Sequence, residues 1–236
     1  MDWYPLLNSL RIAAIATVIV FFAGIWLANL VARAPRLVKG VLDVVLTLPL
    51  VLPPTVVGYL LLILLGPRRP LGALAAQLLD LRLTMVWYAA AFATVVVSFP
   101  LMYRTARGAF EAFDQTLADA ARTLGHSERW VFWRVKMPCC LQGIVAGAVL
   151  AFARALGEYG ATSMLCGYTP GSTATVATTV YQLWRTGDDA GALTWVLVNL
   201  AISAVVLLAM NWFEARGRSG AGGRARGGGG RGGVAR

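Results

Sequence analysis

The residues best suited to recognise an anion lie within apolar sequence. Arg154 and Glu158 are four positions apart in the apolar stretch 139–158, so on a helix they share one face and can form an ion pair. A charge in such a stretch is costly and usually faces protein or water, so Arg154 could alternatively attract a doubly charged anion. We favour the ion pair, because an unpaired cation would hold an anion too tightly for release. Weaker hydroxyl donors to a passing oxyanion stand at Thr55, Ser98, Thr162 and Ser163, although these groups can equally bond carbonyls of their own helices.

The remaining reactive side chains indicate neither a metal site nor a catalytic centre. Cys139 and Cys140 are adjacent, so they point to different faces of a helix, and Cys166 stands apart; we expect three free thiols. The single histidine, His126, lacks the cysteine or carboxylate spacing of a metal ligand set. No glycine-rich phosphate loop of the P-loop pattern is present in the sequence. We therefore predict no metal, no cofactor and no enzymatic activity on this chain.

Five apolar segments are long enough to position these residues inside a membrane. Apolar residues make up 58% of the 236 positions and charged residues 14%, which is typical of a membrane-embedded chain. A hydrocarbon core about 30 Å thick needs roughly 20 residues of helix. The pattern predicts an all-α membrane helix bundle in one domain, residues 1–215, with spans at about 6–32, 41–65, 85–103, 139–158 and 191–213. The second span contains Pro49, Pro53 and Pro54, so we expect it to be kinked or broken.

Three segments outside these spans have distinct patterns. Residues 67–83 carry several charges and predict a short interfacial helix at about 74–79. Residues 174–184 are apolar but short and rich in threonine, which favours a short helix packed in the protein or at the membrane boundary, with a sixth span as the alternative. The glycine- and arginine-rich segment 216–236 is similar to RNA-binding segments, but we interpret it as a disordered extension with no nucleic-acid partner.

Most lysine and arginine residues fall on one side of the predicted membrane. They lie in the loop after the first span, in the loop 104–138 and in the tail, whereas few lie on the opposite side. The positive-inside rule assigns the basic side to the cytoplasm and the N-terminus to the outside. Five spans satisfy this arrangement, whereas a sixth would put the tail outside.

The loop 104–138 has the pattern of two short helices joined by a turn. Ala120 and Ala121 are small enough for close approach to another surface, and Gly125 can end a helix in the left-handed conformation. A second helix can then begin near Ser127. The block would present Phe132 and Trp133 as bulky contacts, with a polar rim of Arg122, Arg129 and Arg134. It suits docking into a groove on a partner protein, and the alternative is an amphipathic helix on the anionic inner leaflet.

The same loop resembles the EAA loop of ATP-binding cassette (ABC) importer permeases. The matching positions are Asp119, Ala120, Ala121, Gly125, Val135, Met137 and Pro138, with aspartate in place of glutamate, valine in place of isoleucine and methionine in place of leucine. The runs 48–59 and 152–162 resemble the molybdate permeases in particular, and sulfate permeases share the second run more loosely. The resemblance extends from about residue 6 to residue 213.

This resemblance implies the fold and the partners of a type I importer permease. Two copies would form a pathway for molybdate, or tungstate, between them in the cell membrane, and an extracytoplasmic binding protein would deliver the oxyanion. Separate ATPase subunits would hydrolyse ATP and dock on Asp119, Ala120, Ala121, Gly125, Val135 and Pro138. The pathway candidates are Thr55, Ser98, Arg154, Glu158 and Thr162. The alternatives are a sulfate or thiosulfate permease, or a channel or scaffold without an energising partner.

Overall fold

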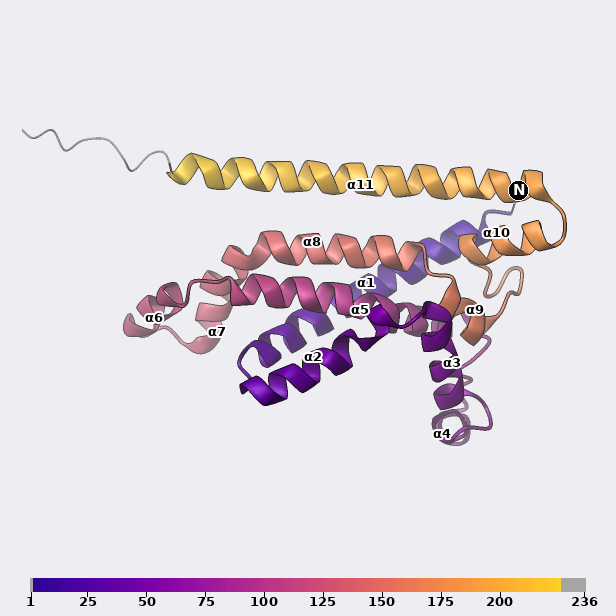
Figure 1. Ribbon diagram of the computed structural model, residues 1–236, viewed down its shortest axis with the longest axis horizontal. Coiled ribbons are helices and arrows are strands. Elements are labelled where there is room, and N and C mark those ends of the chain that lie inside the picture. Colours follow the sequence, from indigo (N-terminus) through magenta and orange to yellow (C-terminus); the bar gives the residue numbers. More distant parts are fainter. Residues whose placement is uncertain (1, 226–236) are drawn as a thin grey trace, which may run out of the picture.

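Every regular element in the described part of the chain, residues 2–225 of this computed structural model, is a helix. Figure 1 shows their arrangement. In chain order the elements are α1 (Tyr4–Ala32), α2 (Arg36–Val51), α3 (Pro54–Leu65), α4 (Pro70–Leu79), α5 (Trp87–Glu111), α6 (Gln115–Thr123), α7 (Glu128–Val131), the π-helix η1 (Phe132–Lys136), α8 (Met137–Leu156), α9 (Gly160–Cys166), α10 (Val176–Arg185) and α11 (Asp189–Ala225). The predicted fold class, an all-α membrane bundle, is confirmed.

Four helices are long and apolar enough to cross a membrane, and a bent pair raises the number of candidate spans to five. The bent pair is α2 with α3, and the others are Tyr4–Ala32, Trp87–Glu111, Glu128–Leu156 and Asp189–Ala209. These agree in place with the five predicted spans. With 10 residues, α10 falls short of the roughly 20 that a span needs, so the segment expected to be a short helix is one.

Three predicted boundaries differ from the structure. The third span does not end near residue 103, because α5 continues to Glu111. The second helix of the loop runs through η1 directly into α8, so the loop 104–138 is in large part the end of one long helix and the start of another. The last helix, α11, extends to Ala225, past the predicted domain boundary at 215. The rest of the segment predicted to be disordered, 226–236, lies outside the described residues.

Two of the helices are interrupted, and their breaks meet. The axis turns by 111° between α2 and α3, at Leu52 and Pro53. Pro49, by contrast, lies inside α2 without ending it. The second break separates α8 from α9, and Gly160 at its end packs against α3, where a Cβ atom would lie 3.0 Å from the Thr55 backbone nitrogen. The proline break and the glycine break thus form one junction.

Close packing of α3 on α9 depends on a glycine. A Cβ atom at Gly58 would lie 2.7 Å from the Cα of Ala161, which only a backbone movement could relieve. We predict that Gly58→Ala lowers the free energy of unfolding by about 1–3 kcal/mol through overpacking. The control Gly40→Ala, in α2 with no atom within 4 Å of the place a Cβ would occupy, should be neutral or stabilising. Thermal unfolding in detergent measures both, and equal stabilities would contradict this packing.

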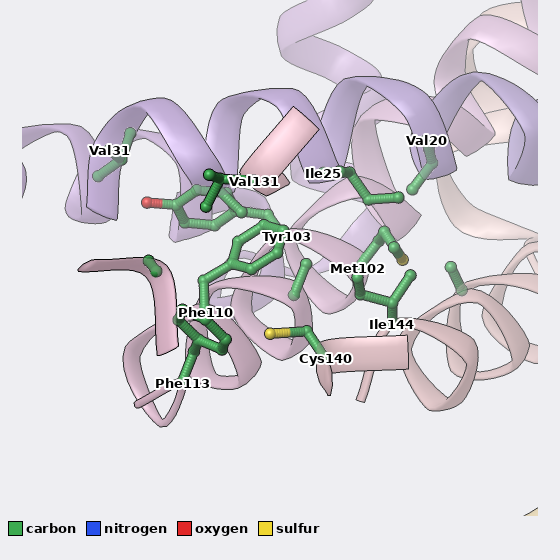
Figure 2. Packing of buried hydrophobic residues seen from close by; sticks show 14 of the residues in the cluster. Val20, Ile25, Val31, Met102, Tyr103, Phe110, Phe113, Val131, Cys140 and Ile144 are labelled. Atoms are coloured by element: carbon green, nitrogen blue, oxygen red, sulfur yellow. The ribbon is translucent and has the colours of Figure 1, made fainter. Parts of the chain in front are cut away.

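The core lies where α1, α5 and α8 pack against one another. Figure 2 shows the largest side chains of this cluster, among them Met102, Tyr103 and Phe110 from α5 and Ile144 from α8. The Tyr103 hydroxyl donates a hydrogen bond of 2.5 Å to Asp43 Oδ1 and so joins α2 to this core. The core holds α1, α5 and α8 together at the end of the bundle that carries α6 and α7.

Candidate coupling loop and polar pathway

Two capped helices form the block between α5 and α8. The Asp114 carboxylate accepts a hydrogen bond of 2.9 Å from the backbone N–H of Thr116 at the start of α6, and this bond lowers the pKa of Asp114. Gly125 follows α6 with a φ of +82°, the left-handed conformation that glycine adopts without strain. The Ser127 hydroxyl then caps α7. The predicted turn at Gly125 and the predicted helix start near Ser127 are confirmed.

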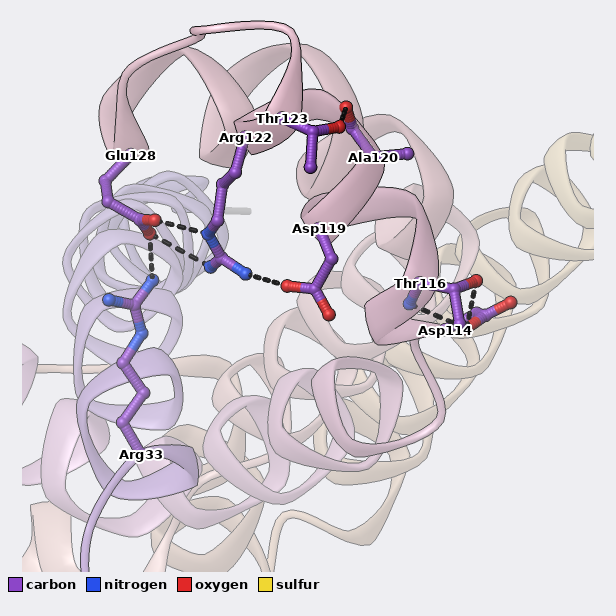
Figure 3. A network of polar contacts seen from close by, with 8 residues as sticks. All are labelled: Arg33, Asp114, Thr116, Asp119, Ala120, Arg122, Thr123 and Glu128. Carbon is purple, nitrogen blue, oxygen red and sulfur yellow. Dashed lines mark hydrogen bonds and ion pairs between the residues drawn. The ribbon is translucent and has the colours of Figure 1, made fainter.

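An ion-pair network joins the two helices of the block to each other and to α1. Arg122 contacts Asp119 and Glu128, each at 2.5 Å, and Arg33 at the end of α1 lies 3.8 Å from Glu128 (Figure 3). The bonds to Glu128 and Asp119 raise the pKa of the Arg122 guanidinium. Arg122, which was predicted for the polar rim, is exposed, and its guanidinium also joins Asp119 to Glu128. Asp119, at the motif position, therefore takes part in the ion pairs that join the two sides of the turn.

The small residues of the motif divide between the inside and the outside of the block. Ala121 is buried together with Ala118, whereas Ala120 is exposed. Val135 is partly buried in η1, and Pro138 is exposed in the first turn of α8. The six motif positions are thus distributed over α6, the turn at Gly125, η1 and the start of α8, and Ala118 is a packing residue that the motif did not indicate.

An apolar patch covers the outer side of the block. We define the outward patch as Leu117, Leu124, Trp130 and Trp133, which are all exposed, Trp133 by 61% and Leu124 by 78%. His126 stacks on Trp130, with 3.7 Å between ring centres. Phe132 was predicted to be an outward contact, and this is wrong: its ring packs inward beside Phe110. The π-helix explains the error, because it shifts the register in which these side chains leave the helix.

The ion pair expected from the spacing of Arg154 and Glu158 is present at the junction of the two broken helices. Arg154 Nη1 lies 2.6 Å from Glu158 Oε2, and the Glu158 side chain is 2% exposed. Its other oxygen, Oε1, accepts a hydrogen bond of 2.7 Å from the Ala161 N–H at the start of α9. Within the described residues Oε2 makes no hydrogen bond, so the ion pair alone compensates that buried oxygen. Glu158 thereby fixes both Arg154 and α9.

The other pathway candidates divide into two groups. Ser98 donates to the Thr94 carbonyl and Ser163 to the Gly160 carbonyl, so both bond their own helices. Thr162 is buried in α9. Thr55 is exposed at the start of α3. It lies beside Gly160, which follows Glu158 of the Arg154–Glu158 pair by two residues in the sequence. Thr55, Glu158 and Thr162 thus belong to α3, the break before α9 and α9 itself, whereas Ser98 is buried in α5.

The cysteines are free, as predicted. Among the side chains described in residues 2–209, no three histidine, cysteine, aspartate or glutamate groups lie together as a metal ion would require.

The comparisons with known proteins define the class of this chain. A family model described as the binding-protein-dependent transport system inner membrane component matches residues 20–219. The chain belongs to this family, whose members are transport subunits, and it is not an enzyme. Its fold is similar to the alginate ABC transporter, with a TM-score of 0.72, 17% identity and coverage of 90% of this chain and 78% of that one. The MetNI methionine ABC transporter gives a TM-score of 0.69, 14% identity and coverage of 90% and 94%.

Relatives identified by sequence indicate which transport system within this family the chain resembles. The chain is 40% identical over 222 residues to the molybdenum transport system permease protein ModB of Escherichia coli (strain K12). The matched residues cover 94% of this chain and 97% of that protein. It is 36% identical over 203 residues to a putative molybdenum transport system permease protein of Bacillus subtilis (strain 168), covering 86% and 89%. The resemblance to molybdate permeases stated from the sequence is confirmed.

Proposed function

We propose that this chain is the membrane-spanning permease subunit of an ATP-driven molybdate importer. The observation that carries the proposal is the capped, ion-paired block α6–α7 with its motif residues, set in a chain that aligns almost end to end with molybdenum permeases. Because these relatives are named for molybdenum, they favour molybdate over the sulfate or thiosulfate alternative. Tungstate remains within the same proposal, since it is an oxyanion of the same charge and shape.

The outward patch is the surface that would dock on the ATPase subunit. Its two exposed tryptophans and two exposed leucines offer aromatic and aliphatic anchors, which dominate the energy of protein interfaces. The Arg122 network makes the block stiff, so a push on the patch is transmitted to α5, α1 and α8 rather than absorbed by the turn. An uncoupled channel or scaffold would need neither the patch nor the network.

The pathway would lie between two copies of the chain. Many apolar side chains of α2 and α11 are exposed in the single chain, and some of these surfaces would be covered by lipid and others by a second copy. Arg154, whose side chain is 28% exposed, is the cation nearest the junction of the broken helices that could meet an oxyanion. The Glu158 carboxylate would moderate that attraction and allow release.

Charge placement supports the orientation proposed for this assembly. The block α6–α7, the ends of α1 and α5 beside it and the start of α2 carry many basic residues, including Arg33, Lys39 and Arg129. The positive-inside rule places this end in the cytoplasm, where an ATPase subunit would be. An extracytoplasmic binding protein would then meet the opposite end, which contains α4 and the start of α1. The tail 216–236 would be cytoplasmic with five spans.

Co-purification with the candidate ATPase subunit tests the docking step. Leu124→Ser and Trp133→Ser should each weaken the complex at least about tenfold, because truncating a buried interface anchor costs roughly 2 kcal/mol or more. The matched control is Leu37→Ser, which changes an equally exposed leucine in α2 and should leave the complex intact. An ATPase that fails to bind wild type, or binds all three variants equally, would remove the importer proposal and leave a channel or scaffold.

A further inference from the structure

A cavity lies beneath the coupling block, on the side facing the bundle. Its volume is about 430 Å³, and it is enclosed by the end of α1, the end of α5, both helices of the block and η1. The charged side chains in its wall are Arg33, Glu111, Arg122, Glu128 and Lys136, with phenylalanine rings between them. It is separate from the outward patch and from the Arg154–Glu158 junction.

The acidic residues of the cavity wall are already bound to other cations. Glu111 pairs with Lys39 and Arg107, of which Arg107 also contacts Asp43. Glu128 pairs with Arg122 and, at the longer distance of 3.8 Å, with Arg33. The carboxylates of the wall are therefore engaged away from Lys136.

Lys136 is a buried cation without a carboxylate partner. It is 7% exposed, and among residues 2–209 no carboxylate oxygen lies within 4.0 Å of its Nζ. One N–H donates to Asn29 Oδ1 at 3.0 Å, and the ammonium lies 4.5 Å from the centre of the Phe110 ring. An ammonium has three N–H donors, so donating capacity remains on the side of the cavity. Burying a cation with so little compensation is costly, which indicates that an anion completes the site.

The backbone at Lys136 is also unusual. The segment Phe132–Lys136 is a π-helix, an element that is rare and frequently occurs at functional sites. One extra residue in a turn rotates the following side chains by roughly 100° relative to a continuous α-helix. The bulge thus turns Lys136 inward to the cavity and leaves Trp133 on the outer surface.

We propose that this cavity binds a tetrahedral oxyanion, held between Lys136 Nζ and the Arg33 guanidinium. The ligand chemistry is a phosphate-like group, supplied either as a free oxyanion in the cytoplasm or as the phosphate of an anionic lipid headgroup. Its occupation connects the end of α1 to the start of α8 directly under the coupling block. The site therefore adjusts how firmly the block is held, a role that goes beyond the proposed transport of molybdate.

Binding of inorganic phosphate to the full chain, purified in detergent and stripped of phospholipid, tests the free-ion source. Isothermal titration calorimetry should show saturable binding that Lys136→Met weakens at least about tenfold, the loss of one strong charge-assisted bond. Arg129→Gln is the matched control, since Arg129 is an exposed cation of α7 outside the cavity wall, and it should retain binding. Arg33→Gln, at an exposed position, should weaken binding several-fold and covers the case in which Lys136→Met does not fold.

Native mass spectrometry tests the lipid source. In nanodiscs of phosphatidylcholine with phosphatidylglycerol, wild type and Arg129→Gln should retain phosphatidylglycerol, and Lys136→Met or Arg33→Gln should lose it. Either calorimetric binding or lipid retention with this mutational pattern supports the site and identifies its source. Neither ligand bound to wild type, or equal binding by wild type and a folded Lys136→Met or Arg33→Gln variant, overturns it.

Discussion

Gly125→Val is expected to abolish most ATP-coupled transport while leaving the membrane helices folded. Gly125 has a φ of +82° between α6 and α7, and a left-handed backbone costs an L-residue roughly 1–2 kcal/mol, with more for a β-branched side chain. The turn would open, and Arg122 would no longer contact both Asp119 and Glu128. The two leucines of the outward patch would then move apart from its two tryptophans. We expect the complex with the ATPase to weaken at least about tenfold.

Two matched variants separate backbone strain from steric size. No atom lies within 4 Å of a Cβ atom placed at Gly125, so a larger side chain has room and only the backbone conformation is at issue. Gly125→Asn should therefore retain most of the complex, because asparagine tolerates the left-handed conformation. Gly108→Ala, in α5 with equal space around it, should have no effect. Affinity of the detergent-solubilised complex measures all three, and wild-type behaviour of the valine variant would contradict this account of the turn.

The second large effect is expected at Glu158. Gln keeps an oxygen that accepts the Ala161 N–H, and Glu158→Gln replaces the charged oxygen that faces Arg154 with an uncharged NH2 group, which cannot accept a hydrogen bond from the guanidinium. Breaking a buried pair costs about 3–5 kcal/mol, but Arg154 is partly exposed and can reach solvent, so we expect a loss of about 1–3 kcal/mol of stability. Thermal unfolding in detergent measures this loss. Molybdate uptake should fall further than stability alone explains, since the freed Arg154 would retain the anion.

A double-mutant cycle tests whether the two side chains act as a pair. Arg154→Met alone leaves the Glu158 carboxylate buried without a cation and should be the most destabilising single change, whereas Arg154→Met with Glu158→Gln should recover part of the loss. Additive losses in the two single variants and the double variant would show that the pair contributes no coupling energy.

The spans and the coupling turn could be predicted because their signals are local. Apolar run length located the five spans, proline placed the break between α2 and α3, and Gly125 marked the turn, after which the second helix was expected to begin near Ser127. The Arg154–Glu158 contact followed from i, i+4 spacing alone, since both residues lie near one helix end.

The errors arose where distant or irregular backbone determines the outcome. The end of α5 was placed too early because the charged residues after Tyr103 are typical of a loop, whereas they pair with residues of α2. The inward position of Phe132 depends on a π-helix that no sequence period indicates. The meeting of the α3 and α9 starts is a tertiary contact made possible by Gly58 and Gly160.

Uptake of radiolabelled molybdate into proteoliposomes tests the central proposal most directly. The vesicles would contain this chain with its ATPase subunits and enclosed ATP, with the molybdate-binding protein outside. The account predicts that uptake requires both ATP and the binding protein. Excess unlabelled molybdate should compete with the labelled ion, whereas excess sulfate should not. Gly125→Val should abolish uptake. Uptake that proceeds equally without ATP, or with Gly125→Val unchanged from wild type, would contradict it.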